Sequence, residues 1–165
     1  MKRDEEFTRF YTGHFDQARR TAYAMCGNWS DAEEITQNAF VRVYSAWARV
    51  RSETAEAYLR TVVTRVFLDT RRRRRGREQA VAEPPERPVP PDTESAEHRQ
   101  NLIPALQELP PRQRAVIVLR FVHDLSVEQV AQTMGCTQGT VKSQTSRGLE
   151  ALRRAFPRAH PRERT

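Results

Sequence analysis

The chain has 165 residues, of which 38% are hydrophobic and 8% aromatic, so it suits one ordinary domain or two small ones rather than a large core. Its formal net charge of +7 favours a polyanionic partner, although charge alone does not separate nucleic acid from an anionic membrane. The sequence shows no long apolar run, no leader-like start and no paired-cysteine spacing. We therefore expect a cytoplasmic protein without a membrane span, a structural zinc or a disulfide.

The positive charge is concentrated in two segments. Residues 59–77 carry 8 basic side chains against 1 acidic, and residues 99–165 carry 11 against 5. Between them, residues 78–98 carry 6 acidic and 1 basic side chain, are rich in proline, and contain no Leu, Ile or aromatic residue. Such a segment cannot bury enough apolar surface to offset its ordering entropy. We predict an all-α fold with two small helical domains, residues 1–77 and 101–157, a flexible acidic linker over 78–100 and a tail over 158–165.

Three helices are predicted in the first domain, and together they form a small bundle. The first ends near Gly27, the second opens with a capping box in which Ser30 caps and Glu33 returns the bond, and the third starts near Ala55. Apolar residues recur every three or four positions in each helix. The expected inward residues are Phe7, Phe10, Tyr11, His14, Phe15, Ala18, Ala22 and Met25, then Ala32, Ile35, Ala39, Phe40, Val43 and Trp47, and finally Leu59, Val62, Val63, Val66 and Phe67.

The second domain is predicted to end in a helix-turn-helix. Leucines at 102, 106 and 109 indicate a short helix, and residues 109–124 indicate another that is opened by proline. A capping signal over 126–129 precedes a helix from Val127 to Met134, which ends at Gly135. Thr137 then caps the last helix, so two helices are joined by a turn that contains glycine.

The last helix has one apolar and one polar edge. Val141, Thr145, Gly148, Leu149 and Leu152 share the inward edge, which leaves small polar and basic residues opposite. Such an edge fits the major groove of DNA, where Gln and Arg can pair with bases and Lys with phosphate; the alternative is a solvated helix face. The helix N-terminus can also receive a phosphate. The candidate DNA contacts are Thr137, Gln138, Gly139, Thr140, Lys142, Ser143, Gln144, Ser146 and Arg147.

These segments resemble the sigma factors of bacterial RNA polymerase. The segment LSVEQVAQTMGCTQGTVKSQTSRGLEALR resembles region 4, NWSDAEEITQNAFVRVYSAW resembles regions 2.1 to 2.2, and EAYLRTVVTRVFLDTRRRRR resembles regions 2.3 to 2.4. Nothing resembles regions 1.1 or 3. The chain is identified as a member of the sigma-70 family, similar to actinobacterial members of its extracytoplasmic-function (ECF) class.

The resemblance implies an initiation factor, not an enzyme, that uses no cofactor or metal. It implies that region 4 reads the minus-35 element and that core polymerase is bound through its beta-prime clamp helices and beta flap. The implied polymerase-binding residues are Asp31, Glu34, Gln37, Asn38 and Val41. The implied minus-ten residues are Arg49, Arg51, Ser52, Arg60, Thr61, Thr64, Arg65, Arg71, Arg72, Arg73, Arg74 and Arg75. The resemblance implies that a flipped base is held beside the loop from Arg49 to Thr54, and that the run from Arg71 to Arg75 holds upstream duplex phosphates; the alternative for this run is a solvated helix end. Relatives commonly carry an acid at the position of Asn38 and Asn at that of Arg65.

Two other function classes stay open from the sequence. One is a free-standing helix-turn-helix regulator that binds an operator as a dimer. The other is a metal-dependent nuclease, against which the sequence shows no carboxylate cluster with metal-ligand spacing. A membrane partner is disfavoured because no basic helix carries a broad aromatic edge. The sequence leaves open the promoter letters, the existence of an anti-sigma factor, and whether the linker enters the polymerase cleft or only tethers the domains.

Overall fold

The computed structural model describes residues 2–80 and 102–159, with side chains described over 2–76 and 102–155. The chain divides into two units, Met1–Pro85 and Glu86–Thr165. Every regular element in the described ranges is helical, which confirms the predicted all-α class. Most of the predicted linker over 78–100, and most of the predicted tail over 158–165, lie outside the described residues.

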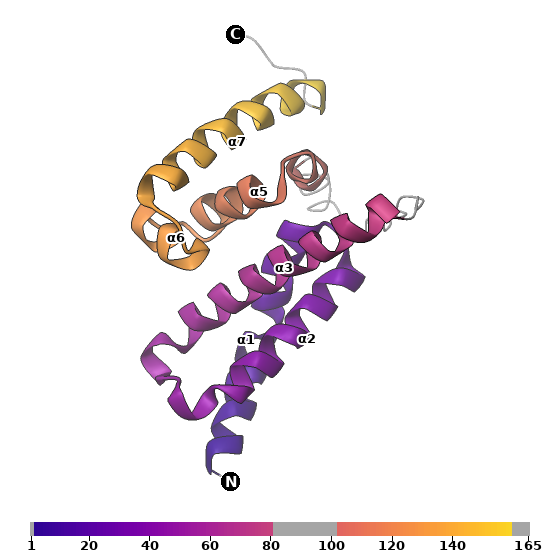
Figure 1. The fold of residues 1–165 in the computed structure, drawn as a ribbon. Helices are drawn as coiled ribbons and strands as arrows, with labels where there is room; N and C mark the ends of the chain where they lie inside the picture. Colours follow the sequence, from indigo (N-terminus) through magenta and orange to yellow (C-terminus); the bar gives the residue numbers. More distant parts are fainter. Residues whose placement is uncertain (1, 81–101, 160–165) are drawn as a thin grey trace. The chain divides into compact units, whose positions relative to one another are not determined.

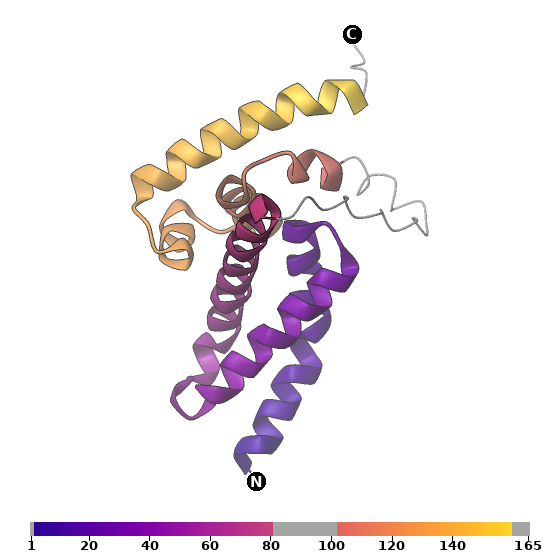
Figure 2. The same ribbon diagram turned by 45° about the vertical axis from the view of Figure 1, so that its right-hand side comes forward.

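The first unit is a bundle of three helices, α1 (Lys2–Cys26), α2 (Trp29–Ser45) and α3 (Ala55–Ala80). Figures 1 and 2 show these helices lying side by side, and each helix packs against the other two. Two short 3-10 turns, Trp47–Arg49 and Ser52–Thr54, connect α2 to α3. All five inward residues predicted for the third helix are buried, and Phe67 is fully enclosed. The predicted start near Ala55 is confirmed, and the helix continues three residues beyond the predicted domain end at residue 77.

The first half of α1 is less buried than its apolar pattern predicts. Ala18, Ala22 and Met25 are buried, but Tyr11 is 38% exposed. Phe7 lies at the centre of an aromatic cluster, with its ring centroid 4.9 Å from that of Tyr44 and 5.3 Å from that of Trp47. The inward positions near the start of α1 therefore form a partly exposed aromatic contact with the end of α2 rather than a closed core.

The predicted capping box at the start of the second helix is wrong. Asn28 is the N-cap, and its side-chain oxygen accepts a hydrogen bond from the backbone N–H of Asp31 at 2.9 Å. The chain leaves α1 through Gly27 at a φ of 78°, a conformation that glycine adopts without steric cost, and α2 begins directly after Asn28. Ser30 consequently lies inside the first turn, and Glu33 forms an ion pair with Arg19 at 3.4 Å instead of returning a capping bond.

The second unit contains a helical segment over 102–107, followed by α5 (Pro111–Ile117), α6 (Val127–Met134) and α7 (Gln138–Ala159). Helix α7 packs against both α5 and α6. The predicted capping box is confirmed: the Gln129 N–H donates to Ser126 Oγ at 3.1 Å, and the Ser126 N–H donates to Gln129 Oε1 at 2.9 Å. Helix α6 ends at Gly135 in the left-handed conformation, as the sequence predicts, and α6 and α7 form the expected helix-turn-helix.

The helix predicted over 109–124 is two elements rather than one. Helix α5 ends at Ile117, and a π-helical turn follows over Val118–Val122. Before this change the chain is anchored by Arg114, which is 4% exposed and donates to the backbone oxygens of Leu106 at 2.9 Å and Leu109 at 2.8 Å. These bonds tie α5 to the end of the preceding helical segment, where the Leu106 oxygen also accepts the backbone N–H of Leu109 at 3.0 Å.

Candidate nucleic-acid and protein interfaces

The polar edge of α7 is mostly exposed; on the predicted inward edge Val141, Gly148 and Leu152 are buried, and Thr145 and Leu149 are half-buried. Lys142 and Arg147 are exposed, whereas Val141 is completely buried and Leu152 is 8% exposed. Among the predicted DNA contacts, the exposed residues are Thr137, Gln138, Gly139, Lys142, Ser143, Ser146 and Arg147; Thr140 and Gln144 are half-buried. The helix therefore presents small polar and basic groups along one line, which is the shape that lets a helix enter a major groove.

The first turn of α7 is closed by its own cap. Thr137 Oγ1 accepts a hydrogen bond from the backbone N–H of Thr140 at 3.1 Å and contacts the Thr140 hydroxyl at 3.0 Å. Gly139 adds no side chain to this turn, which keeps the turn narrow. The space beside it is open, because a Cβ added there would meet only Thr137 Oγ1, at 3.8 Å. The cap fixes where the helix begins and uses one of the free N–H groups that an N-terminus would otherwise offer to a phosphate.

A second exposed surface is a strip of residues along α2. Glu34, Gln37, Asn38 and Val41 are all exposed and recur at helical spacing, and Val41 is 64% exposed. Tyr44, 41% exposed, lies one turn beyond Val41 and extends the strip. The sequence reasoning missed Tyr44, although its position three residues after Val41 could have indicated it. An exposed aliphatic and an exposed aromatic residue among polar neighbours suit contact with a partner helix.

Asp31 belongs to the predicted strip but points its carboxylate toward α3. Arg74 donates from Nη1 to Asp31 Oδ2 and from Nη2 to Asp31 Oδ1, both at 2.8 Å. The Asp31 side chain is 16% exposed. Its charge is therefore matched within the bundle.

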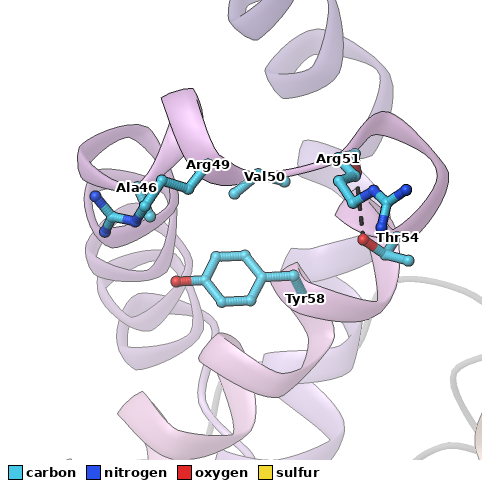
Figure 3. Close-up of a pocket in the computed structure, with 6 residues that line it drawn as sticks. All are labelled: Ala46, Arg49, Val50, Arg51, Thr54 and Tyr58. Carbon is cyan, nitrogen blue, oxygen red and sulfur yellow. Dashed lines mark hydrogen bonds between the residues drawn. The ribbon is translucent and has the colours of Figure 1, made fainter.

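A pocket of about 230 Å³ lies where the chain passes from α2 to α3. In Figure 3 the ring of Tyr58 lies across from the loop, with Val50 above it and the arginine side chains toward either end. The loop is held by a hydrogen bond from Thr54 Oγ1 to the backbone oxygen of Arg51 at 3.4 Å. The lining residues are Ala46, Arg49, Val50, Arg51, Thr54 and Tyr58.

The structure brings two of the predicted minus-ten residues, Arg49 and Arg51, to this pocket, while Ser52 is exposed outside its lining. Tyr58, which is 37% exposed, was not among the predicted residues. A signal for it in the sequence is an aromatic residue in the first turn of α3, directly before the inward Leu59. The aromatic ring can stack on a flat ligand, and the two guanidinium groups beside it can donate hydrogen bonds to the edge of that ligand.

The predicted residues along α3 differ in exposure. Thr64 is completely buried, and its hydroxyl donates to the Arg60 backbone oxygen at 2.9 Å, so its side chain does not reach the surface. Arg65 is exposed, and Arg60 and Thr61 are half-buried. The arginine run also divides: Arg72, Arg73 and Arg75 are exposed, and Arg71 and Arg74 are half-buried.

The chain contains two cysteines, and both are free. Cys26 is buried, and its Sγ donates to the Asn28 backbone oxygen at 3.3 Å. Burial raises the pKa of the Cys26 thiol to about 11, so the thiol stays protonated at neutral pH. Among the side chains described over 2–76 and 102–155, no three His, Cys, Asp or Glu residues form a group that could hold a metal ion. No helix within those ranges has the length and apolarity that a membrane crossing requires.

Comparisons with known proteins match both units. The sigma-70 region 2 family matches residues 10–77, and the sigma-70 region 4 family matches residues 105–154. The chain is 39% identical over 148 residues to the ECF RNA polymerase sigma factor SigE of Mycolicibacterium smegmatis, which covers 85% of this chain and 57% of that protein. It is 34% identical over 149 residues to the RNA polymerase sigma-E factor of Streptomyces coelicolor, covering 90% of this chain and 84% of that protein.

Among solved structures, the fold is similar to that of the sigma factor RpoE from Bartonella quintana, in complex with the anti-sigma factor NepR. The TM-score is 0.79 at 22% sequence identity, covering 92% of this chain and 97% of that one. At this identity the likeness concerns the fold.

Proposed function

The chain belongs to the ECF class of the sigma-70 family of RNA polymerase sigma factors, and we propose that it binds core RNA polymerase and directs initiation at promoters with minus-35 and minus-ten elements. The observation that carries the proposal is the pairing of two matched regions in one chain, each with an exposed polar surface on its own helix. The polymerase catalyses RNA synthesis. The chain contributes recognition, acts in the cytoplasm, and uses no cofactor or metal of its own.

Recognition of the minus-35 element is assigned to α7. Its exposed Gln138 and Arg147 can form paired hydrogen bonds with base edges, and Lys142 can neutralise a phosphate. The cap at Thr137 sets where the helix enters the groove, and the buried edge at Val141 fixes its rotation. Together these features set which side chains reach the bases.

Recognition of the minus-ten element is assigned to the pocket between α2 and α3. Extruding a base costs stacking energy, about 1.4 kcal/mol per base-pair step. Contacts between the pocket and the extruded base must offset this cost. The ring of Tyr58 can stack on the base, and Arg49 and Arg51 can donate to its edge or to the adjoining phosphate. Arg65 stands where relatives commonly carry Asn, so we expect the preferred minus-ten bases to follow a different pattern of hydrogen-bond donors.

Polymerase binding is assigned to the exposed strip of α2, namely Glu34, Gln37, Asn38, Val41 and Tyr44. Its partner is the coiled coil of beta-prime clamp helices, and the second unit adds a contact with the beta flap. Val41 supplies the apolar centre of the surface, with polar residues beside it, as in helix-to-helix recognition. Asn38 lacks the negative charge that relatives commonly carry there, which lowers the electrostatic part of the affinity.

An anti-sigma factor is included among the proposed partners because the Bartonella quintana relative is bound to one. A protein that covered the strip on α2 would block the polymerase contact directly. This control would need no change in the fold of the chain.

Reconstitution tests the proposed function. The full chain is added to sigma-free core polymerase, the complex is isolated, and transcription is run on a library of genomic fragments with start sites read by sequencing. We expect a complex and starts at a small set of sites that share two upstream motifs, neither of which core polymerase alone produces. A chain that binds defined DNA but never binds polymerase would be a free-standing helix-turn-helix regulator, and starts no different from those of core alone would refute the proposal.

A further inference from the structure

The arginine run of α3 is fixed to the junction between α1 and α2. Arg74 donates two hydrogen bonds of 2.8 Å each to the carboxylate of Asp31, in the first turn of α2. Arg71, three residues earlier on α3, donates from Nη2 to the backbone oxygen of Cys26 at 3.1 Å, and Cys26 is the last residue of α1. The late part of α3 is therefore tied to both other helices of the bundle.

The Asp31–Arg74 contact differs from the other ion pairs of this helix in geometry and burial. Both carboxylate oxygens are engaged, and the two side chains are 16% and 34% exposed. The Arg72–Asp69 pair has one contact at 2.9 Å, and its arginine is 78% exposed. A two-pronged, partly buried pair is stronger and better oriented than a pair at the surface. Asp31 also lies at a helix N-terminus, where a negative charge is favourable.

These contacts divide the run by helical period. Arg71 and Arg74 lie three residues apart and share the face that is tied to α1 and α2. Arg72, Arg73 and Arg75 are exposed on the remaining surface. Five consecutive arginines thus supply two inward contacts and three exposed side chains, of which Arg72 also donates to Asp69 on its own helix.

We propose that Asp31 and Arg74 are positioning residues for DNA binding: their ion pair, assisted by Arg71, holds the end of α3 so that Arg72, Arg73 and Arg75 face duplex phosphates. Asp31 thereby acts through Arg74 and is not a contact for polymerase. This inference rests on the proposed function, because it assigns roles within the same DNA-binding unit.

The direction in which one substitution changes DNA affinity distinguishes a positioning role from a simple effect of charge. Asp31→Asn removes a negative charge, so charge alone would make the chain bind DNA more tightly. If the pair positions the arginines, the same change weakens binding. We measure affinity by fluorescence anisotropy of a labelled duplex of random sequence against the full chain, over a series of salt concentrations.

We expect Asp31→Asn to bind roughly threefold more weakly at low salt, with a shallower dependence on salt because fewer phosphates are neutralised. The matched control is Glu33→Gln, which makes the same charge change on an exposed side chain of the same helix and should bind as tightly as wild type or more tightly. Arg74→Gln should also weaken binding, and the double variant should lose little more than Arg74→Gln alone. Unchanged or tighter binding by Asp31→Asn, or additive losses in the double variant, would overturn the proposal.

Polymerase binding is measured on the same proteins and separates this inference from the proposed function. Asp31→Asn should bind core polymerase as wild type does, and a loss of that binding would make Asp31 a polymerase contact and overturn the assignment. Failure of the wild-type chain to bind polymerase would instead refute the proposed function. Circular dichroism establishes that each variant is folded. If Asp31→Asn does not fold, Asp31→Glu replaces it: this change keeps the charge, so weaker DNA binding supports positioning and equal binding overturns it.

Discussion

At the scale of single residues, burial decides which charges are available to a partner. Arg114 counts toward the net charge of +7, yet it is 4% exposed and bonded to backbone carbonyls. Arg74 is likewise engaged with Asp31. Composition therefore overstates the positive charge that is available to a partner, and the exposed Lys142, Arg147 and outward arginines of α3 carry a larger share of it.

Cys26 gives a prediction for the pH dependence of stability. Burial raises the pKa of its thiol from 9.0 to about 11, so the unfolded chain loses this proton before the folded chain does. The stabilising contribution is complete below about pH 9 and is lost as the pH rises toward 11. We expect the free energy of unfolding of wild type to fall by about 2 kcal/mol more than that of Cys26→Ala across this range.

Urea unfolding at several pH values measures this difference, and comparison with Cys26→Ala removes the contributions of other groups that titrate there. The folded chain should also react with iodoacetamide at the half-buried Cys136 before Cys26. Equal pH dependence in the two proteins would show that the thiol is more accessible than its burial indicates.

At the scale of elements, the close contact between α5 and α7 depends on Gly148. A Cβ at this position would lie 2.8 Å from Ile117 Cγ1 and 3.0 Å from Ile117 Cδ1, and Ile117 is buried. The two helices can approach at this point because glycine has no side chain. The contact holds α7 against the unit and keeps its polar edge exposed.

We expect Gly148→Ala to lower the free energy of unfolding by about 1 kcal/mol. Overpacking a core typically costs about 1–3 kcal/mol, which exceeds the stabilisation that alanine contributes through its higher helix propensity. Gly139→Ala is the matched control on the same helix, since its added Cβ would meet only Thr137 Oγ1 at 3.8 Å, and it should be neutral or stabilising. Urea unfolding of the two variants measures the difference. Stabilisation by both would mean that Ile117 moves aside at little cost.

Helix periodicity predicted the elements better than it predicted their ends. The apolar spacing of α3 identified five residues that are all buried, and the predicted cap at Ser126 and end at Gly135 are both correct for α6. The start of α2 was misplaced because Asn28 and Ser30 are both good capping residues, and the local sequence does not rank them. The choice follows from the path of the chain through Gly27, which the packing of α1 against α2 determines.

At the scale of the whole molecule, the two units are proposed to have separable tasks. Lys142→Glu combined with Arg147→Glu places negative charge on the edge of α7 that is proposed to bind DNA. Glu34→Arg combined with Gln37→Ala reverses the charge on the strip of α2 that is proposed to bind polymerase. All four side chains are exposed, so neither pair removes core packing. The two surfaces can therefore be disabled one at a time.

We expect the α7 pair to lower minus-35-dependent transcription by about tenfold or more while leaving polymerase binding unchanged, since one good base contact is worth 1–3 kcal/mol. The α2 pair should lower polymerase binding and leave duplex binding intact. Pull-down of core polymerase and anisotropy with a promoter duplex measure the two properties on each protein. Loss of both properties in either variant would point to misfolding or to a wrong assignment of the surface.

The sequence by itself determined the features that depend on neighbours within about four residues: helix periodicity, the capping box at Ser126, the left-handed stop at Gly135 and the exposed edge of α7. Tertiary structure alone decided which residues meet from distant parts of the chain. It pairs Asp31 with Arg74 and Cys26 with Arg71, and it places the ring of Phe7 beside that of Tyr44. Packing of the three helices also buries Thr64. The physical reason is that a local pattern fixes which way a side chain points on its own helix, while its partner is set by how the helices pack.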